Sequence, residues 1–244
     1  MSSTLIDPKK HRQLFLDDYA VEKKIGVKQS VHSPQKSGPV IRPDQSLGET
    51  DIQSRSVPQW NPDKGIWEWW YRGKYVYYAT STDGENWETP SLSLYECNGS
   101  KDNNIACDPE GYERHLFHII RDENDPDPQR RYKGLFKTDN RYLGTSPDGF
   151  KWTMLDVPPI PSSDESHFTY DEISGQYIAM VKHGTKWGRS VFLSTSKDFR
   201  NFTKPELIFH TDEIDWENCR KRVREVIDNP AYITPPVIDD EDYI

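Results

Sequence analysis

A chain of 244 residues with 40 Asp and Glu against 31 Lys and Arg carries a formal charge of −9. Phosphate backbones and anionic lipids are bound by clustered positive charge, so this balance excludes an extended nucleic-acid or membrane surface. The one basic run, at 219–226, follows an acidic stretch, and we interpret it as a solvated helix face or loop. No stretch approaches the roughly 18 apolar residues of a membrane span.

The N-terminal segment MSSTLIDPKKHRQ lacks the apolar core of a secretory signal, which predicts a cytoplasmic protein unless a signal has been removed. The three cysteines are odd in number and have no C-x-x-C spacing, which argues against a disulfide framework or a zinc site. The segment DENDPDP (122–128) places Pro126 and Asp127 where a calcium loop needs an oxygen ligand and a glycine, and so predicts a hairpin turn. We expect neither a metal nor a cofactor.

The first strand predicted along the chain is LFLDD, residues 14–18. Its paired acids, Asp17 and Asp18, point to opposite faces of a strand, so they cannot share one proton directly. We expect a structural role for one of them and leave the role of the other open.

Three sets of short segments rich in aromatic and β-branched residues follow, as is typical of strands. The strands of these sets are expected at 54–61, 65–73, 74–81 and 91–96, then at 115–122, 130–137, 141–146 and near 154–160, and last at 166–172, 175–183, 190–196 and 206–210. No amphipathic helix of normal length intervenes. Each set therefore predicts a four-stranded antiparallel meander.

One turn motif recurs in all three sets, as TSTDGENW (80–87), TSPDGFKW (145–152) and TSKDFRNF (195–202), with starts 65 and 50 residues apart. Its Asp accepts turn N–H groups and its Gly supplies positive φ, so the motif is structural rather than catalytic. The acids concerned are Asp83, Asp148 and Asp198. In the third copy Phe199 replaces Gly, so that turn is expected to close differently. The aromatic that ends each copy (Trp87, Trp152, Phe202) is expected to wedge between neighbouring blades.

Four strands that recur every 50 to 65 residues are typical of β-propeller blades. The fold class predicted is therefore all-β, with about three blades in a single domain over 1–244. We expect an N-terminal arm and closing strand at 1–50, blades at 51–100, 101–160 and 161–212, and the start of a fourth blade or a linker at 213–244.

The segments RQLFLDDYAVEK and RDENDPDPQRRYKGLF, together with the S-x-D-G-x-x-W turns, resemble bacterial proteins of the group called glycosyl hydrolase family 32 N-terminal domain-like. That group belongs to the five-bladed propellers of glycoside hydrolase families 32, 43 and 68. The resemblance implies five blades, whereas this chain shows three. We therefore expect an N-terminal fragment, in which the strand at 14–18 completes a last blade that is missing. The family 32 signatures W-M-N-D-P-N-G and E-C are not present.

The N-terminal ends of the innermost strands of a propeller converge at one mouth of its channel, so acids that precede these strands are candidates for catalysis. They are Asp51, Asp108, Asp164 and Glu165. Glycoside hydrolysis needs two such groups, one to protonate the leaving oxygen and one to attack or to activate water.

The resemblance implies three roles. Asp51 takes the place of the nucleophile or base, Asp108 that of the transition-state stabiliser, and Glu165 that of the acid. Each position departs from the family pattern: Asp51 lacks the flanking N and P-N-G, Asp108 follows Cys where Arg is usual, and Glu165 precedes Ser where Cys is usual. Asp122 is the alternative for the second role, although it follows its inner strand and is expected in a solvated turn.

Binding of a carbohydrate substrate is assigned to Asp164, His167 and Arg55. His167 binds a sugar hydroxyl or tunes the acid, or else it is a packed channel histidine. His32 is a further candidate for the mouth. Trp67, Trp69 and Trp70 suggest stacking on sugars, but on a middle strand both faces meet neighbouring blades, which favours core packing.

Two functions remain open. The first is a glycoside hydrolase that acts through these carboxylates. The second is a propeller without catalysis that binds a saccharide or a protein at the same mouth, because one fold hosts both roles.

Overall fold

The computed structural model of the protein describes residues 18, 21–36, 38–229 and 231. The chain divides into two compact units, residues 1–38 and 39–244. Of the closing strand expected at 14–18, only Asp18 is among the described residues, and it forms an ion pair with Lys24. Asp17 and the strand itself lie outside the described residues.

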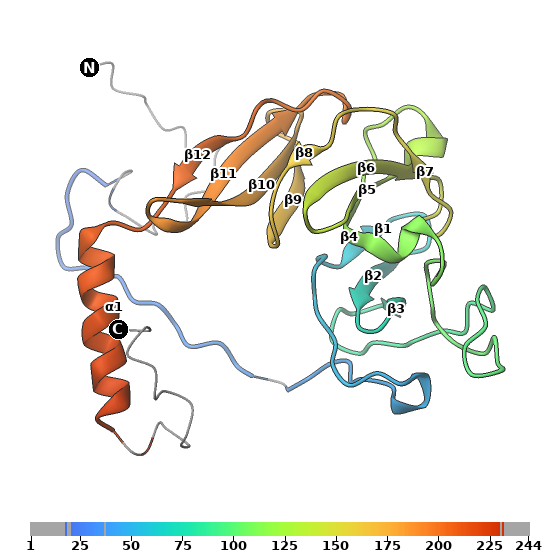
Figure 1. Ribbon diagram of the computed structural model, residues 1–244, viewed down its shortest axis with the longest axis horizontal. Coiled ribbons are helices and arrows are strands. Elements are labelled where there is room, and N and C mark those ends of the chain that lie inside the picture. Colours follow the sequence, from blue (N-terminus) through green and yellow to red (C-terminus); the bar gives the residue numbers. More distant parts are fainter. Residues whose placement is uncertain (1–17, 19–20, 37, 230, 232–244) are drawn as a thin grey trace. The chain divides into compact units, whose positions relative to one another are not determined.

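The second unit is built from three antiparallel sheets that succeed one another along the chain (Figure 1). The first contains β1 (Gln59–Asn61), β2 (Ile66–Arg72) and β3 (Val76–Ser81). The second contains β4 (Leu116–Arg121), β5 (Tyr132–Phe136), β6 (Asn140–Ser146) and β7 (Thr153–Met154), with β8 (Ile160–Pro161) also paired to β6. The third contains β9 (Ser166–Asp171), β10 (Gln176–Thr185), β11 (Gly188–Ser196) and β12 (Glu206–Phe209). The predicted all-β fold class is confirmed.

The first sheet differs from the prediction at its outer edge, because residues 91–96 form no strand. Ser93 adopts a left-handed backbone there, with φ 55°. The edge of β3 is instead closed by two isolated bridges, Thr80 with Glu88 and Tyr77 with Ile105. The buried segment around Ile105 thus takes the place that we had assigned to a fourth strand.

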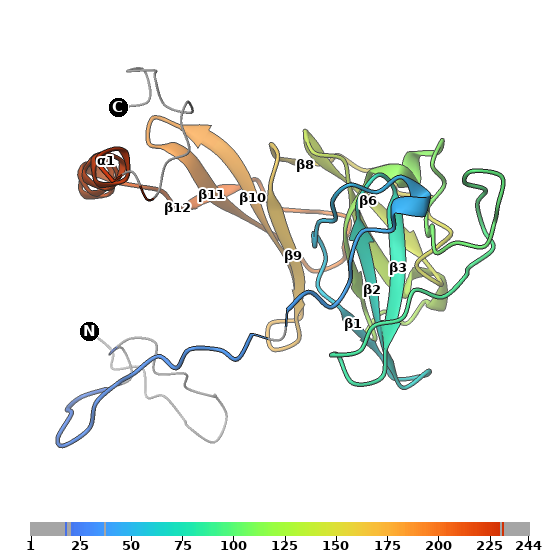
Figure 2. The same cartoon turned by 90° about the horizontal axis from the view of Figure 1, so that it is seen from below.

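The first strands of the three sheets are neighbours, since β4 contacts both β1 and β9 (Figures 1 and 2). The free edge of β4 is satisfied by side chains of the preceding sheet. The N–H groups of Ile119 and Arg121 donate to Ser56 Oγ at 2.9 Å and Gln59 Oε1 at 3.0 Å. An unpaired strand edge is a costly exposure of backbone groups, and these side chains remove it.

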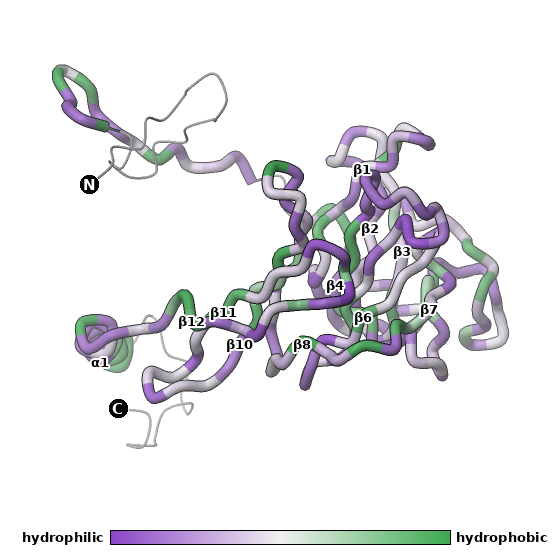
Figure 3. The backbone as a smooth tube through the Cα atoms, turned by 90° about the horizontal axis from the view of Figure 1, so that it is seen from above, coloured by the Kyte–Doolittle hydropathy of each residue, from purple (hydrophilic) through white to green (hydrophobic). Residues whose placement is uncertain are grey.

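Two apolar layers fill the joints between the sheets. Figure 3 shows hydrophobic stretches along the strands, while the loops that join them are more hydrophilic. One layer packs Trp70 and Tyr78 against Leu116 and Phe136 of the second sheet, and the other packs Leu135 against Phe168 of the third. Trp70 is buried in this core, as the alternation of β2 predicted.

Each joint also holds one buried carboxylate that a tyrosine of the next sheet binds. Glu68 on β2 has no exposed surface and accepts from the Tyr132 hydroxyl at 2.6 Å. Asp122, which directly follows β4, is 2% exposed, accepts from the Tyr177 hydroxyl and pairs with Lys133 Nζ at 3.1 Å. The expectation of a solvated turn for Asp122 was therefore wrong.

The three repeated turns close in the same way. Asp83, Asp148 and Asp198 each accept two backbone N–H groups of their own turn at 2.8 or 2.9 Å. Phe199 adopts a left-handed φ of 56°, close to those of the glycines in the other two copies. The third turn thus does not close differently, which corrects our prediction.

The helices of the described residues are few and short. They are the 3₁₀ turns η1 (Gln45–Leu47), η2 (Tyr112–His115) and η3 (Pro128–Arg130), and the α-helix α1 (Glu213–Ile227). A capping box of Asp212 and Asp215 begins α1, and the basic run at 219–226 lies on it without a buried residue. None of the described helices is long and apolar enough to cross a membrane.

Candidate functional site

The segment before β1 meets the segment before β9, and an ion pair marks the place. Arg55, four residues before β1, pairs through Nη1 with Oε2 of Glu165, the residue directly before β9. Two further bonds run from Arg55 to Gln53 Oε1, at 3.0 Å from Nε and 2.8 Å from Nη2. The structure therefore brings two predicted site residues, 110 positions apart, into contact.

Three arginines surround one phenyl ring at this point. The guanidinium carbons of Arg141, Arg55 and Arg72 lie 4.4, 5.1 and 5.6 Å from the ring centre of Phe117, the second residue of β4. Phe117 itself is buried. Cations over an aromatic face are attracted by its quadrupole, so the ring gathers positive charge beside Glu165.

Arg141, near the start of β6, fixes the chain just before β9. It is fully buried and donates to Ser166 Oγ at 2.7 Å, to the Lys137 carbonyl at 2.5 Å and to the Asp164 carbonyl. Burial lowers the pKa of Arg141 to about 10, although Glu165 and Asp164 oppose this shift. The guanidinium remains charged at neutral pH and holds both residues that flank Glu165.

The two histidines of the site differ in exposure. His118 is buried beside Arg141, with Nε2 2.8 Å from Ser166 Oγ, and burial followed by that positive charge lowers its pKa to about 3. His118 is therefore neutral at physiological pH. His167 is exposed, with its ring centre 6.5 Å from that of His118, so it is not a packed channel histidine.

Asp164 is engaged by a lysine. Its carboxylate pairs with Lys182 of β10, and this contact lowers the pKa of the exposed carboxyl. Its backbone has a left-handed φ of 57°, which turns the chain immediately before Glu165. The side chain thus positions a lysine, and its role in ligand binding stays a prediction.

The other two predicted catalytic acids are held separately. Asp51 is exposed and accepts from Thr50 Oγ1 at 3.2 Å, while Asp108 accepts from the backbone of Glu110 at 2.9 Å. Within the described part of the chain, no hydrogen bond or ion pair joins either carboxylate to Glu165. Their catalytic roles therefore stay predictions.

Arg72 lies between the segments that carry these two acids. Its backbone pairs with Gln53, two residues after Asp51. Its charge also acts on Cys107, the neighbour of Asp108: burial raises the pKa of that buried thiol, and Arg72 opposes the rise. Sequence reasoning missed Arg72, Phe117 and Arg141. The one signal for Arg72 is a cation at the end of an otherwise aromatic strand.

No cluster of three or more His, Cys, Asp or Glu that could hold a metal occurs among the residues that the structure describes. His32 lies in the first unit, is exposed, and has no defined position with respect to this site.

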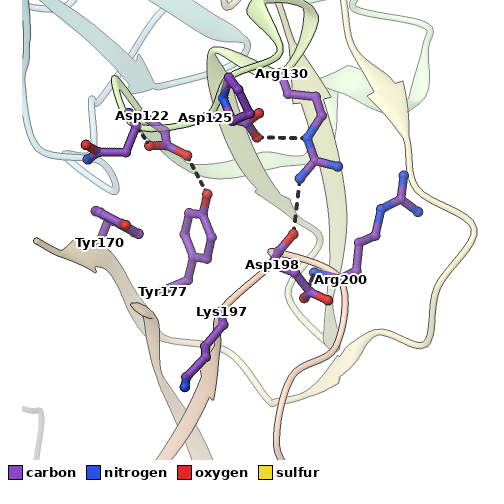
Figure 4. A pocket seen from close by; sticks show the side chains of 10 residues that line it. Asp122, Asp125, Arg130, Tyr170, Tyr177, Lys197, Asp198 and Arg200 are labelled. Carbon is purple, nitrogen blue, oxygen red and sulfur yellow. Dashed lines mark hydrogen bonds and ion pairs between the residues drawn. The ribbon is translucent and has the colours of Figure 1, made fainter. Parts of the chain in front are cut away.

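A pocket of about 460 Å³ lies past the opposite ends of the inner strands, after β4 (Figure 4). Its charged groups bind one another. Arg130 donates to Asp125 at 2.8 Å and to the Asp198 carbonyl at 3.1 Å, and Tyr177 donates to Asp122. Burial raises the pKa of Asp125, but Lys133, the Asp127 N–H and Arg130 together lower it to about 2. These pairs join the second and third sheets, and the exposed side chains of Lys197 and Arg200 also line the pocket.

No protein-family model and no curated protein sequence matches the chain. Solved structures to which it is similar include the β-fructofuranosidase of Schwanniomyces occidentalis in complex with fructosyl-erythritol, at 16% identity and TM-score 0.44, over 66% of this chain and 35% of that one. A thermostable family 43 glycoside hydrolase is similar at 11% identity and TM-score 0.44, over 67% and 55%. An N-acetylgalactosamine deacetylase from F. plautii is similar at 16% identity and TM-score 0.42, over 64% and 53%.

The chain thus spans about one third to just over one half of these proteins. The solved structures to which the chain is similar thus include glycoside hydrolases of families 32 and 43, the families that the sequence segments and the turn motifs resemble. At these identities the similarity says nothing about the reaction.

Proposed function

We propose that the protein is a carbohydrate-active protein of the glycoside hydrolase type, with its site at the N-terminal ends of the inner strands. The contact between Glu165 and Arg55 carries this proposal. The Glu165 side chain is 45% exposed, so a ligand reaches it, while Arg55 of another sheet fixes its position. A carboxylate that is both accessible and held in one geometry is what acid–base catalysis requires.

In this proposal Glu165 exchanges a proton with the glycosidic oxygen. Asp51 either attacks the anomeric carbon of the sugar or activates a water that does so, and Asp108 stabilises the transition state. Arg55 holds the Glu165 carboxyl in place for this proton exchange. Exposed Asp164 and His167 face the same mouth and bind sugar hydroxyls.

Activity of the purified protein on a panel of aryl glycosides and oligosaccharides tests this proposal, with Glu165→Gln beside the wild type. We expect turnover to fall by about 100-fold or more, since general acid–base groups contribute about 10²–10⁴ in rate. Glu172→Gln is the matched control, because this exposed glutamate follows the opposite end of β9. Turnover that survives Glu165→Gln would exclude Glu165 as the acid.

One observation favours the second function, a saccharide-binding protein without catalysis. Asp51 is exposed, and among the described residues its carboxylate accepts a hydrogen bond only from its neighbour Thr50, so no other element of the fold holds it in the fixed geometry that catalysis requires. Saccharide binding without turnover on any member of the panel, in the wild type as in Asp51→Asn, would establish this function instead.

A further inference from the structure

Two of the three guanidinium groups at the candidate site have no ion-pair partner among the described residues. Three guanidinium groups face the Phe117 ring, and of these only Arg55 pairs with a carboxylate, that of Glu165. The nearby carboxylate of Asp164 pairs with Lys182.

Arg141 is bound by neutral groups only. Its donors reach two carbonyl oxygens and the Ser166 hydroxyl, which satisfy hydrogen bonds without cancelling the charge. Its guanidinium lies 4.4 Å from the Phe117 ring and is fully buried. The buried charge therefore adds to the positive potential that a ligand meets at the mouth.

The guanidinium of Arg72 has no hydrogen-bond acceptor or ion-pair partner among the described residues, and it lies over the Phe117 ring. Burial, followed by the charge of Arg55, lowers its pKa. The same field acts on His115, whose pKa is lowered first by burial and then by Arg114, Lys137 and Arg72. The nitrogens of Arg72 are not among the buried polar atoms left without a partner, so they remain open to solvent and can donate to an incoming anion.

We propose that Arg72, together with Arg55, binds an anionic group of the saccharide, a carboxylate or a sulfate ester, so that the site takes an acidic glycan. This inference rests on the proposed carbohydrate function. The planar guanidinium matches both anions through two parallel hydrogen bonds. When Arg55 turns to the anionic group, Glu165 is released from its ion pair and is free to contact the glycosidic oxygen of the bound sugar.

The proposal is tested by binding of paired saccharides that differ only in charge. Oligomers from pectate, alginate and chondroitin sulfate are titrated beside their methyl-esterified or desulfated derivatives, with tryptophan fluorescence or calorimetry as the readout. We expect at least one acidic member to bind about 10- to 100-fold more tightly than its neutral derivative. The preference is expected to weaken as salt is raised from about 50 to about 500 mM.

Arg72→Met removes the charge and keeps the packing length against Phe117, and it is expected to abolish the preference for the acidic member. Arg72→Lys keeps a positive charge but loses the two parallel donors of the guanidinium, and it is expected to retain part of the preference for the acidic saccharide. If thermal unfolding shows that Arg72→Met does not fold, Arg72→Lys tests the proposal instead. Arg220→Met on α1, which is exposed, is the control and should bind as the wild type does.

Three outcomes separate the two proposals. Equal binding of acidic and neutral members, unchanged in Arg72→Met, would overturn the anion inference and leave the carbohydrate function standing. Inorganic sulfate that binds through Arg72, without any saccharide bound, would overturn both the acidic glycan and the carbohydrate function. Absence of all binding, sulfate included, would overturn the anion site itself.

Discussion

Phe199 shows why a glycine usually follows the aspartate in the repeated turn. A left-handed backbone costs a residue with a side chain about 1–2 kcal/mol. Phe199 is fully buried, with its ring 5.2 Å from Tyr177 and 5.7 Å from Phe168. Burial of a phenyl group contributes about 1.5–3 kcal/mol, which offsets the strain. Our prediction for this turn failed because it considered φ without the packing of the side chain.

The glycines of the other two turns differ in what lies next to them, which gives a matched pair of variants. A Cβ on Gly149 would lie 2.4 Å from a ring carbon of Trp70, whereas one on Gly84 would lie 3.8 Å from Trp67. Both residues have φ near 80°. We expect Gly149→Ala to cost about 2–4 kcal/mol of unfolding free energy and Gly84→Ala about 1 kcal/mol. Urea unfolding measures both; equal losses would show that Trp70 moves aside freely.

The candidate site was only partly predictable at the residue scale. Glu165 was found because it lies just before an inner strand, and Arg55 was named because it lies near the start of another, since position along the chain is visible in a sequence. Phe117 and Arg141 were missed because a β4 ring and a β6 guanidinium meet only after two hairpins have folded. The register of β4 with β5 and of β5 with β6 determines that these two side chains lie next to each other. Strand register cannot be inferred from composition.

At the scale of elements, the joint between the first two sheets depends on one buried acid. Burial would raise the pKa of Glu68, but hydrogen bonds from Lys64, Tyr132 and Tyr78 lower it below the ordinary value of 4.5. A lowered folded-state pKa means that the stabilisation is complete above about pH 4.5 and is lost as pH falls through the folded value. The joint is therefore weakened by acid.

Glu68→Gln tests this dependence. At neutral pH we expect a loss of about 2–4 kcal/mol, because the buried donors lose their charged acceptor. Between about pH 6 and pH 3 the variant should lose less stability than the wild type, because its amide does not titrate. Unfolding free energies at several pH values measure this, with Glu172→Gln as the control. A variant whose stability falls as steeply as that of the wild type would place the acid sensitivity elsewhere.

The strands of the second and third sheets were predictable because aromatic and β-branched runs alternate with turn motifs. The outer edge of the first sheet was not. Asn104 donates to the Tyr78 carbonyl at 2.9 Å and to the Tyr71 hydroxyl at 3.0 Å, and Asn103 donates to the Tyr95 carbonyl at 2.9 Å. These side-chain amides, together with backbone bonds from Tyr78 to Asn104 and from Ala106 to Val76, hold an irregular segment at the edge where a strand was expected. A reading based on strand propensity cannot detect this, since Asn is a residue of turns.

At the scale of the molecule, the last strand of the third sheet leaves apolar side chains exposed. Leu207, Ile208 and Phe209 on β12 are 44, 50 and 65% exposed. On its other side, β12 pairs with no further strand among the described residues. Exposed apolar edge strands favour pairing between chains.

We therefore expect self-association that grows with concentration, and Ile208→Lys should reduce it, because a lysine on an edge opposes pairing. Sedimentation velocity at increasing concentration measures the effect. Ile173→Lys is the control, since Ile173 is 84% exposed but lies in the turn after β9. If both variants associate as the wild type does, the β12 edge is not the contact.

The spacing of the turn motif was sufficient to predict the order of the sheets and the adjacency of their first strands. It was insufficient for the number of blades: the five implied by the resemblance remain a prediction. Closure depends on pairing between the ends of a propeller, and the strand expected at 14–18 lies outside the described residues. Local sequence determines a meander, whereas closure is a property of the entire ring.

The hydroxyl of Ser56 ties the site to the backbone of β4, because it accepts the Ile119 N–H directly beside Arg55. An amide held by a side chain of another sheet exchanges its hydrogen with solvent only when the two sheets separate locally. The exchange rate of the Ile119 amide hydrogen therefore reports whether a ligand is bound at the site. A ligand that immobilises Arg55 should slow the exchange of the Ile119 amide, whereas the amide of Val181 in the middle of β10 should keep its rate. Hydrogen–deuterium exchange thus measures occupancy of the site without an attached probe.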